Sequence, residues 1–334
     1  MEQQPIRVIQ YGLGAIGRAA ARLVLERPGL ALVGAIDCNP HFAGRDLGQV
    51  LELGHDLDVP VTGDAEELLG HIGADVVIHC TGSSFANVLP ELAGIVENDL
   101  HCVTSCEEAL FPYWRNTDIA CDFNNLCVSH SVSVLGTGVN PGFVMDTLPI
   151  VMTAVSQRVD AVRVSRIVNA ATRREALQRK VGASMTEKDF SALVEASKMG
   201  HAGLIESAAL LADGLGWALD DIQETVEPVI ATSTVRTDYL TVTHGQVAGV
   251  HQVARGFRGG KEVLTLDLKM YVGAPNPRDE IEILGVPPLR VVVDGGTPGD
   301  LATPAILVNM IPALLTAVPG LHTMKTLPLP RITA

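Results

Sequence analysis

The first half of the chain alternates short apolar runs with segments of helical periodicity, and this alternation constrains the fold most strongly. The apolar runs are "IRVIQYG" (6–12), "LALVGAID" (30–37), "DVVIHCTG" (75–82), "HCVTSC" (101–106) and "SVSVLGTG" (131–138). Segments such as "AIGRAAARLVLER" and "VLPELAGIVEN" between them repeat apolar residues at helical spacing. Strands that are apolar on both faces and separated by helices form parallel sheets covered on both sides. We therefore predict an α/β fold with a Rossmann-type doubly wound parallel sheet.

The pattern changes from about Asp146. A helical segment, "TLPIVMTAVSQ", leads into the extended "DAVRVSRIVNA" and then into a polar helical region that ends near Gly216. Extended segments follow, joined by turns such as "RGGKE" and "GAPNPRDE", which predicts a second α+β domain with a mostly antiparallel sheet. The last helix, from about Ala302, is apolar nearly all round, and we expect it to return to the first domain. The predicted domains are 1–145, completed by 300–334, and 146–299.

Composition and charge exclude several classes of partner. The formal net charge of −14 disfavours non-specific nucleic-acid binding and adsorption to an anionic membrane. The longest apolar stretch is interrupted by Asn309, Pro312 and Pro319, so we expect a buried helix there and no membrane span. We find no export signal at the N-terminus, and none of the six cysteines forms a CxxC pair. These features predict a cytoplasmic protein with reduced thiols and no metal site.

A glycine motif follows the first predicted strand. "YGLGAIGR" places Gly12, Gly14 and Gly17 in a GxGxxG pattern, with Ala15 and Ile16 at the start of the next helix. Glycines in this pattern allow a tight turn and close approach of the backbone to a pyrophosphate at a helix N-terminus. The motif therefore predicts dinucleotide binding by the first domain, with a structural glycine turn as the alternative.

An acidic residue follows at the spacing that dinucleotide sites require. Asp37 ends the second predicted strand, 20 residues beyond Gly17, where a carboxylate accepts hydrogen bonds from the adenine-ribose hydroxyls. The same carboxylate repels a 2′-phosphate, which favours NAD(H) over NADP(H). Arg45 is near enough in sequence to weaken that preference, so NADP(H) stays open as a cofactor.

Further polar residues follow the other predicted strands. Because ligands of doubly wound sheets bind beyond the carboxyl ends of the strands, we expect these residues to line the cofactor site. Thr81, Gly82 and Ser83 are assigned to the ribose and pyrophosphate side, and the Asn140 amide to the nicotinamide carboxamide. Ser105 is a further predicted cofactor-binding residue. The alternative for each residue is an ordinary turn.

Two adjacent carboxylates, Glu107 and Glu108, also follow a predicted strand, just before an apolar run. Neighbouring residues on an extended segment point to opposite sides, so at most one is expected to face the nicotinamide. A carboxylate at that place suits a substrate that is cationic or becomes so, because it takes a proton from an ammonium and stabilises an iminium. The alternative is that both residues only begin the next helix.

Several segments together resemble a known family. "YGLGAIGR", "VGAIDCNP", "TSCEEALFP", "GVNPGFVMD", "GHAGLIES" and "GDLATPAILVN" are similar to NAD(P)-dependent 2,4-diaminopentanoate dehydrogenases and native amine dehydrogenases, which share the dihydrodipicolinate reductase-like fold. The resemblance spans nearly the whole chain. It implies reversible oxidative deamination of an amine to a carbonyl compound and ammonia, with a glutamate of the "CEE" segment, Glu108 or Glu107, as the acid/base. It also implies a homodimer formed through the sheet of the second, substrate-binding domain, and an active site between the domains.

The resemblance also suggests pocket residues. Pro141, Phe143 and Met145 of "NPGFVMD" are expected to line the substrate pocket. His251 is a further candidate, although its apolar setting, like that of His201, favours a hydrogen-bonded structural role.

Two other functions remain open from the sequence. One is reduction of a cyclic imine, as in dihydrodipicolinate reductases, although the region "ATRREALQRKVGASMT" lacks their His-His-x-x-Lys-x-Asp-Ala-Pro-Ser-Gly segment. The other is a redox-sensing regulator that binds NAD(H) without turnover.

Overall fold

The computed structural model describes residues 4–332 and divides into two compact units. The first contains the chain up to Gly142 and again from Pro298, and the second contains Phe143–Thr297. These boundaries lie within a few residues of those predicted at 145/146 and 299/300.

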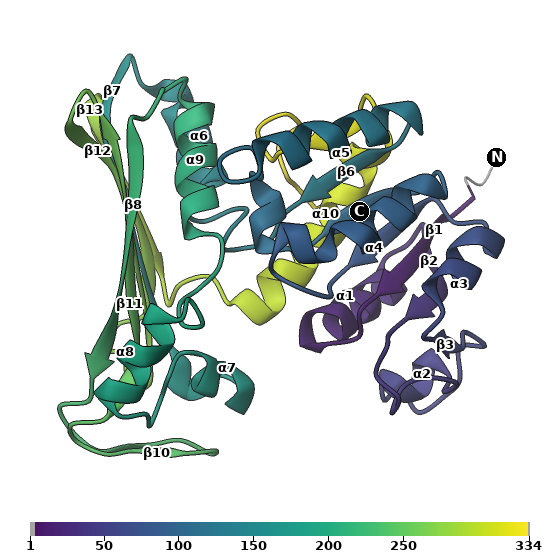
Figure 1. Ribbon diagram of the computed structural model, residues 1–334, viewed down its shortest axis with the longest axis horizontal. Coiled ribbons are helices and arrows are strands. Elements are labelled where there is room, and N and C mark those ends of the chain that lie inside the picture. The colour runs from purple at the N-terminus through teal and green to yellow at the C-terminus, as the bar shows by residue number, and fades with distance from the viewer. Residues whose placement is uncertain (1–3, 333–334) are drawn as a thin grey trace. The chain divides into compact units, whose positions relative to one another are not determined.

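The first unit is built on a seven-stranded, fully parallel sheet (Figure 1). Its order is β15-β6-β5-β4-β1-β2-β3, which confirms the predicted doubly wound topology. The strands are β1 (Ile6–Tyr11), β2 (Leu30–Ile36), β3 (Val61–Thr62), β4 (Val76–His79), β5 (His101–Thr104), β6 (Ser133–Gly136) and β15 (Gly320–His322). The short edge strands β3 and β15 were not predicted.

Helices cover both faces of this sheet. On one face α1 (Ala15–Glu26) packs against α10 (Gly299–Leu315), so the apolar last helix belongs to this unit. The other face carries α3 (Ala65–His71), α4 (Phe85–Glu97) and α5 (Thr117–Ser129), while the short α2 (Leu47–Val50) lies between β2 and β3. Burial of apolar residues between these layers stabilises the unit. The core includes Ile9, Val77, Phe85, Leu92 and Ile95, all of which have no exposed surface.

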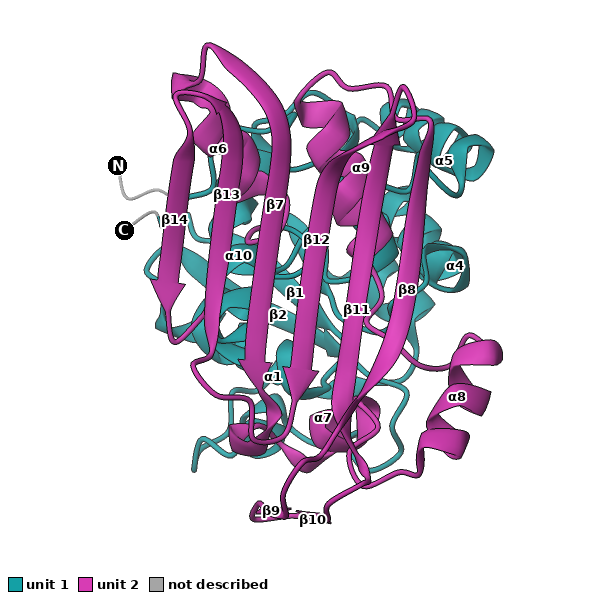
Figure 2. Ribbon diagram, turned by 90° about the vertical axis from the view of Figure 1, so that its left-hand side faces the viewer, with its two compact units in different colours: residues 1–142, 298–334 teal, residues 143–297 magenta. Residues whose placement is uncertain are grey.

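The second unit is a six-stranded sheet of order β14-β13-β7-β12-β11-β8 (Figure 2). Only the pair of β7 and β12 is parallel, so the sheet is mostly antiparallel, as predicted. The strands are β7 (Arg158–Asn169), β8 (Asp221–Ile230), β11 (Val247–Arg258), β12 (Lys261–Tyr271), β13 (Arg278–Val286) and β14 (Leu289–Asp294). A hairpin of β9 (Val235–Arg236) and β10 (Thr241–Val242) extends from the unit.

Helices cover one face of this sheet and leave the other bare. α9 (Leu204–Gly214) packs on β8, β11 and β12 and also contacts α6 (Thr147–Met152). α7 (Glu175–Lys180) and α8 (Glu187–Glu195) lie toward one end of the unit. Among residues 4–332, no helix covers the face that Figure 2 turns toward the viewer, here called the open sheet face. Nor is any helix in that range long and apolar enough to cross a membrane.

A buried ion pair fixes the end of the second unit. Arg166 on β7 and Asp279 on β13 are only 3% and 1% exposed, and Nη1 of Arg166 lies 2.9 Å from the Asp279 carboxylate. The Arg166 guanidinium also donates to the carbonyl of Thr297 at 2.6 Å, and Asp279 accepts from the Thr297 N–H at 2.7 Å. The pair therefore holds the chain to the sheet at the last residue of the unit.

Candidate functional site

The turns after β1, β4, β5 and β6 lie at one edge of the parallel sheet, here called the carboxyl edge. These turns, with the first residues of α1, hold residues 12–17, 81–83, 105–108 and 137–142, which include every residue of the predicted cofactor site except Asp37. β1 lies between β2 and β4, where the winding of the sheet reverses direction, and such positions bind ligands in open α/β sheets. The structure thus brings the predicted residues to the expected place.

The three glycines of the glycine loop, residues 12–17, differ in the space that the surrounding protein leaves for a side chain. Gly12 has φ +89°, and a Cβ there would lie 2.5 Å from the Cys80 carbonyl oxygen. A Cβ at Gly17 would lie 1.9 Å from the Gly12 carbonyl oxygen, whereas one at Gly14 would meet nothing within 4 Å. Protein packing therefore requires Gly12 and Gly17, while Gly14 borders open space.

Helix α1 begins beside that open space. Gly14 is its N-cap, Ala15 is its first residue, no side chain caps it, and its first turn holds no acidic residue. The N–H groups of a first turn and the helix dipole favour an anion. Together with the space at Gly14, they fit the pyrophosphate of a dinucleotide.

The carboxylate of Asp37, at the end of β2, is held next to the glycine loop. Its Oδ2 accepts from the Leu13 N–H at 2.6 Å and its Oδ1 from the Asn39 N–H at 2.8 Å. Each carboxylate oxygen accepts more than one hydrogen bond, so acceptor capacity remains for ribose hydroxyls. Asp37 is half-buried, which leaves part of the carboxylate accessible.

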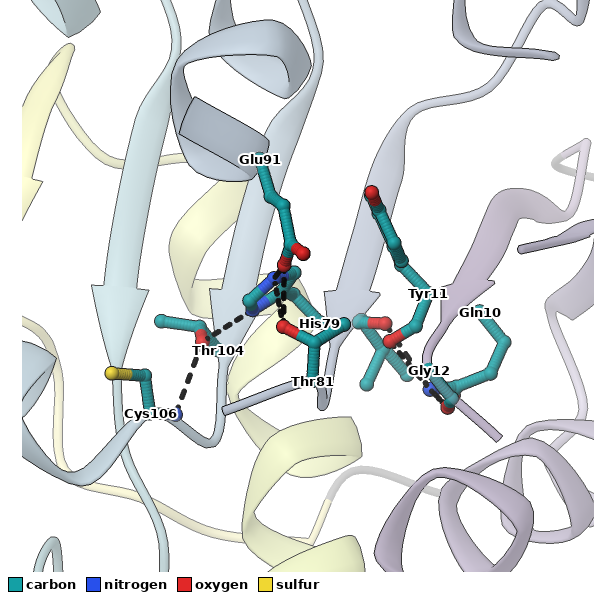
Figure 3. A network of polar contacts seen from close by, with 9 residues as sticks. Gln10, Tyr11, Gly12, His79, Thr81, Glu91, Thr104 and Cys106 are labelled. Carbon is teal, nitrogen blue, oxygen red and sulfur yellow. Dashed lines mark hydrogen bonds and ion pairs between the residues drawn. The ribbon is translucent and has the colours of Figure 1, made fainter. Parts of the chain in front are cut away.

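Gln10 is a site residue that the sequence analysis missed. It is fully buried in β1, and its Nε2 donates to the carbonyls of Gly12 at 3.0 Å and Ile78 at 3.2 Å. The amide thus ties the glycine loop to β4 (Figure 3). The signal in the sequence was a single neutral polar residue in an otherwise apolar strand.

A second missed feature is the hydrogen-bonded network around His79, the last residue of β4 (Figure 3). The imidazole has no exposed surface, and its Nε2 lies 2.8 Å from Oε2 of Glu91 on α4. Its Nδ1 lies 2.8 Å from Oγ1 of Thr104 on β5. The Thr81 hydroxyl donates to the same Glu91 oxygen, and Thr104 Oγ1 accepts from the Cys106 N–H at 3.1 Å.

The charge of Glu91 acts on its surroundings. The hydrogen bond from His79 lowers the pKa of Glu91, so its carboxylate is ionised at neutral pH. Burial, assisted by that charge, raises the pKa of Tyr11 to about 12. The Tyr11 ring packs edge-on to the His79 ring, with centroids 5.4 Å apart.

The glutamate pair is not extended, which corrects one expectation. Glu107 and Glu108 begin a 3-10 turn, η1 (Glu107–Leu110), because the Ala109 N–H donates to the Cys106 carbonyl at 3.1 Å. Oε2 of Glu108 accepts from the N–H of Phe85, the first residue of α4, at 2.8 Å. Glu108 therefore caps the preceding helix and not the following one. Within the described residues, its Oε1 makes no hydrogen bond.

Glu107 lies close to two thiols. Burial, with a smaller contribution from the charge of Glu107, raises the pKa of Cys80 to about 11 and that of Cys106 to about 12. Both thiols are therefore protonated at neutral pH and are poor nucleophiles. Glu107 and Glu108 are both half-buried, so neither is fully exposed to solvent.

The turn after β6 holds Asn140 in a tightly packed setting. A Cβ at Gly138 would lie 2.8 Å from the Pro141 carbonyl oxygen, and Gly142 has φ +126°. The Val139 N–H donates to Thr303 Oγ1 on α10 at 3.3 Å. Asn140 is half-buried at the carboxyl edge, which is compatible with its predicted contact to the cofactor.

The predicted pocket residues do not all come together. Pro141 and Met145 are buried and Phe143 is half-buried. His251 lies on the open sheet face, where its Nε2 is 3.0 Å from Asp267 Oδ1. The structure does not bring His251 together with Phe143 and Met145, because those two residues lead into α6 on the helix-covered side.

The neighbouring Gln252, on the helix-covered side, fixes the loop before α9. Its amide accepts from the His201 N–H at 2.7 Å and donates to the His201 carbonyl at 3.0 Å. This clamp holds the backbone of the "GHAG" segment, between Gly200 at φ +121° and Gly203 at φ +95°. Over residues 4–332 we find no group of three or more His, Cys, Asp or Glu side chains able to hold a metal ion.

The topology of the first unit and its open glycine loop define a dinucleotide-binding α/β protein. Residues 6–106 match the family model of the dihydrodipicolinate reductase N-terminus. Residues 143–334 match the model of the 2,4-diaminopentanoate dehydrogenase C-terminal domain. The chain belongs to the 2,4-diaminopentanoate dehydrogenase family, which confirms the resemblance seen in the sequence.

Similarity to individual proteins extends over nearly the whole chain. The chain is 30% identical over 334 residues to 2,4-diaminopentanoate dehydrogenase of Acetoanaerobium sticklandii, covering 98% of this chain and 95% of that protein. It is 25% identical over 354 residues to the amine dehydrogenase of Streptomyces virginiae, covering 97% and 96%. Among solved structures, the amine dehydrogenase of Mycobacterium smegmatis superposes with a TM-score of 0.88 at 26% identity, covering 98% and 97%.

Proposed function

We propose that this chain catalyses the reversible oxidative deamination of an amine with a nicotinamide dinucleotide as hydride acceptor. An ammonium-bearing carbon, NAD⁺ and water give a ketone or aldehyde, ammonium, NADH and a proton; the reverse reaction is reductive amination. The observation that carries the proposal is the match of residues 143–334 to the 2,4-diaminopentanoate dehydrogenase C-terminal domain, together with 30% identity to such an enzyme over 98% of the chain and a fixed glutamate at the carboxyl edge. The relatives named for amine substrates support it.

The glycine loop and its surroundings support NAD(H) as the cofactor. The open space at Gly14 and the uncapped start of α1 suit the pyrophosphate. Asp37 suits an adenine ribose with free hydroxyls, because its negative charge disfavours a 2′-phosphate. We propose NAD(H) as the preferred cofactor and NADP(H) as the weaker one. The bound nicotinamide would supply the hydride acceptor.

Glu108 is the proposed acid/base. One carboxylate oxygen is held by the Phe85 N–H, which fixes the direction of the other, Oε1. In deamination Oε1 takes a proton from the substrate ammonium, and the freed lone pair on nitrogen supports loss of hydride from the neighbouring carbon. Once Oε1 has released that proton to solvent, the regained carboxylate stabilises the cationic iminium, takes a proton from the attacking water and passes it to the departing nitrogen. Glu107 is the alternative, at the same turn.

Glutamine variants of the two residues test this assignment. Glu108→Gln keeps an oxygen that accepts from the Phe85 N–H, so the fold is preserved while the acid/base is lost. We expect kcat to fall by about 10²–10⁴-fold, the usual effect of losing a general base. Glu107→Gln, a matched isosteric change one residue away, is expected to cost far less. A large loss in Glu107→Gln with little loss in Glu108→Gln would reverse the roles.

The substrate half of the chain favours deamination over reduction of a cyclic imine. Only the first part matches a dihydrodipicolinate reductase model, whereas residues 143–334 match the dehydrogenase family. Ammonia distinguishes the two reactions. Reductive turnover that requires ammonium supports deamination chemistry, and turnover of a preformed imine without ammonium supports the reductase alternative.

We also propose that a second copy of this chain covers the open sheet face. The face carries charges of both signs, including the pairs His251–Asp267 and Arg290–Glu280, and such mixed charge suits a self-complementary contact. The half-buried apolar residue Ile167 lies on the same face. Sedimentation is expected to give about twice the 35.3 kDa chain mass, and a purely monomeric protein would refute the dimer.

We also propose a cytoplasmic location for this protein. Its six free thiols support this location, because thiols stay reduced in the cytosol.

A further inference from the structure

We propose that His79 and Glu91 are positioning residues that couple the cofactor-binding turn at Thr81 to the glutamate turn, residues 105–108. A single buried imidazole joins the ends of β4 and β5 to α4, as Figure 3 shows. This inference rests on the proposed function, because it assigns the glutamate turn a role in proton transfer.

The burial of His79 shows that its position is specified. It follows Val76, Val77 and Ile78 in β4, all fully buried, and it has no exposed surface itself. A polar ring in such a place is destabilising by about 1–3 kcal/mol for each nitrogen left without a partner. Both nitrogens of His79 have partners at 2.8 Å, so the ring is held in one orientation.

The donors and acceptors of the network are consistent with one arrangement of protons. The Cys106 N–H donates to Thr104 Oγ1, so the Thr104 hydroxyl proton is free to donate to Nδ1 of His79. The other ring nitrogen then carries the proton and donates to the Glu91 carboxylate, which also accepts from the Thr81 hydroxyl. This places a proton on Nε2, the ring nitrogen that faces the ionised Glu91 carboxylate.

The network reaches the cofactor site through Thr81. Because the Thr81 hydroxyl proton is donated to Glu91 and protonated Nε2 of His79 lies 2.9 Å from Oγ1, that oxygen offers a ligand only a remaining lone pair. Thr81 then accepts a hydrogen bond from a hydroxyl of the nicotinamide ribose, which ADP lacks, and does not bind a phosphate oxygen, which is itself an acceptor. Thr81 is exposed at the carboxyl edge, as a ligand contact requires.

The network reaches the glutamate turn through Thr104. Its Oγ1 holds the N–H of Cys106, the residue immediately before η1. Cys106 is 1% exposed and Thr104 is fully buried, so the start of the turn is fixed by packing as well as by this bond. Loss of the Thr104 hydroxyl is therefore expected to loosen Glu108 without touching the cofactor.

Threonine-to-valine variants separate the two ends of the network while keeping side-chain shape. Thr81→Val is expected to raise the dissociation constants of NADH and ADP-ribose by about 3–10-fold, the effect of one or two hydrogen bonds, and that of ADP by less than about twofold. Thr104→Val is expected to lower kcat by about 3–10-fold with the NADH dissociation constant within about twofold. Thr117→Val is the matched control, because the Thr117 hydroxyl donates only to the Tyr113 carbonyl on an exposed part of α5.

The coupling itself is tested in a His79→Asn background. If the imidazole links the two ends, both valine effects shrink to less than about twofold there, because His79 no longer holds the Thr81 and Thr104 hydroxyls in position through its own contacts with them. Glu91→Gln is the second variant, since Glu91 lies partly exposed on α4 and its replacement is expected to fold. It keeps the shape of the side chain and is expected to reproduce the ADP-ribose effect of Thr81→Val.

Three outcomes decide the inference. Additive valine effects in the His79→Asn background would overturn the coupling. Lower thermal stability of His79→Asn and Thr104→Val with unchanged kcat and dissociation constants would reduce the network to a structural role and would also overturn it. If the wild-type protein binds NADH but turns over no amine, the proposed function fails. The link between His79 and Thr81 is then still tested by the ADP-ribose dissociation constant, on which Thr81→Val should have a smaller effect in the His79→Asn background.

Discussion

Alanine substitutions at two glycines of the glycine loop are expected to have different effects. Gly12→Ala should lower the stability of the protein, whereas Gly14→Ala should lower its affinity for the cofactor. At Gly12, alanine must adopt φ +89° and place its Cβ 2.5 Å from the Cys80 carbonyl oxygen. The left-handed backbone costs about 1–2 kcal/mol and the forced displacement about 1–3 kcal/mol more. We therefore expect Gly12→Ala to lose about 2–5 kcal/mol of unfolding free energy.

Gly14→Ala is expected to fold normally and bind poorly. Its Cβ would meet no protein atom within 4 Å, and the backbone has φ −62°, so the unfolding free energy should change by less than about 0.5 kcal/mol. The added methyl group occupies the space assigned to the pyrophosphate. Loss of one charged hydrogen bond, about 1.5–3 kcal/mol, would raise the NADH dissociation constant by about 10–150-fold.

Calorimetric titration with NADH and thermal unfolding followed by circular dichroism measure the two effects. Gly94→Ala is the control, because a Cβ at Gly94 of α4 also meets nothing within 4 Å and lies outside the glycine loop. It is expected to retain both stability and affinity. A folded Gly14→Ala protein that binds NADH as tightly as wild type would refute the assignment of the loop to the pyrophosphate.

Three further predictions follow from individual contacts. Asp37→Ala is expected to raise the ratio of kcat/KM with NADP⁺ to that with NAD⁺ by about tenfold or more, because it removes a charge that repels a 2′-phosphate; an unchanged ratio in steady-state assays would contradict this. The pKa of Glu91 is lowered in the folded protein, so its stabilising effect is complete above the ordinary value of 4.5 and is lost as pH falls through the lower folded-state pKa. Melting temperatures of wild type and Glu91→Gln should therefore differ above about pH 5 and converge in stronger acid, and a pH-independent difference would oppose the assignment. Arg166→Met is expected to destabilise the protein by about 3–5 kcal/mol in urea titrations, because it leaves the Asp279 charge buried without its partner, whereas replacing both residues by apolar ones should cost less.

The elements that the sequence predicted are those with a local signal. β1, β2, β4, β5 and β6 were recognised because each is a continuous apolar run next to a helix of regular periodicity. β3 and β15 have two and three residues, too few to show any period. The order of the second sheet, in which β7 lies between β12 and β13, depends on pairings across about a hundred residues and has no local signature.

The candidate site was predicted in position but not in detail. The glycine loop and Asp37 were found because their spacing is dictated by the ligand. Gln10 and His79 were missed because their hydrogen-bond partners are distant in the sequence. Gln10 donates to the carbonyl of Ile78, 68 residues away, and His79 contacts Thr104, 25 residues away. The extended conformation expected for the glutamate pair was wrong, since the 3-10 turn is imposed by contacts of Glu108 with the start of α4.

Oxidation of NADH by aldehydes and ketones, measured with and without ammonium, tests the central claim most directly. We expect ammonium-dependent oxidation of NADH with at least one carbonyl compound of a broad panel. Glu108→Gln is expected to lose this activity while it binds NADH as tightly as wild type. Tight NADH binding with no ammonium-dependent oxidation of NADH across the panel would contradict the proposal that this protein interconverts amines and carbonyl compounds.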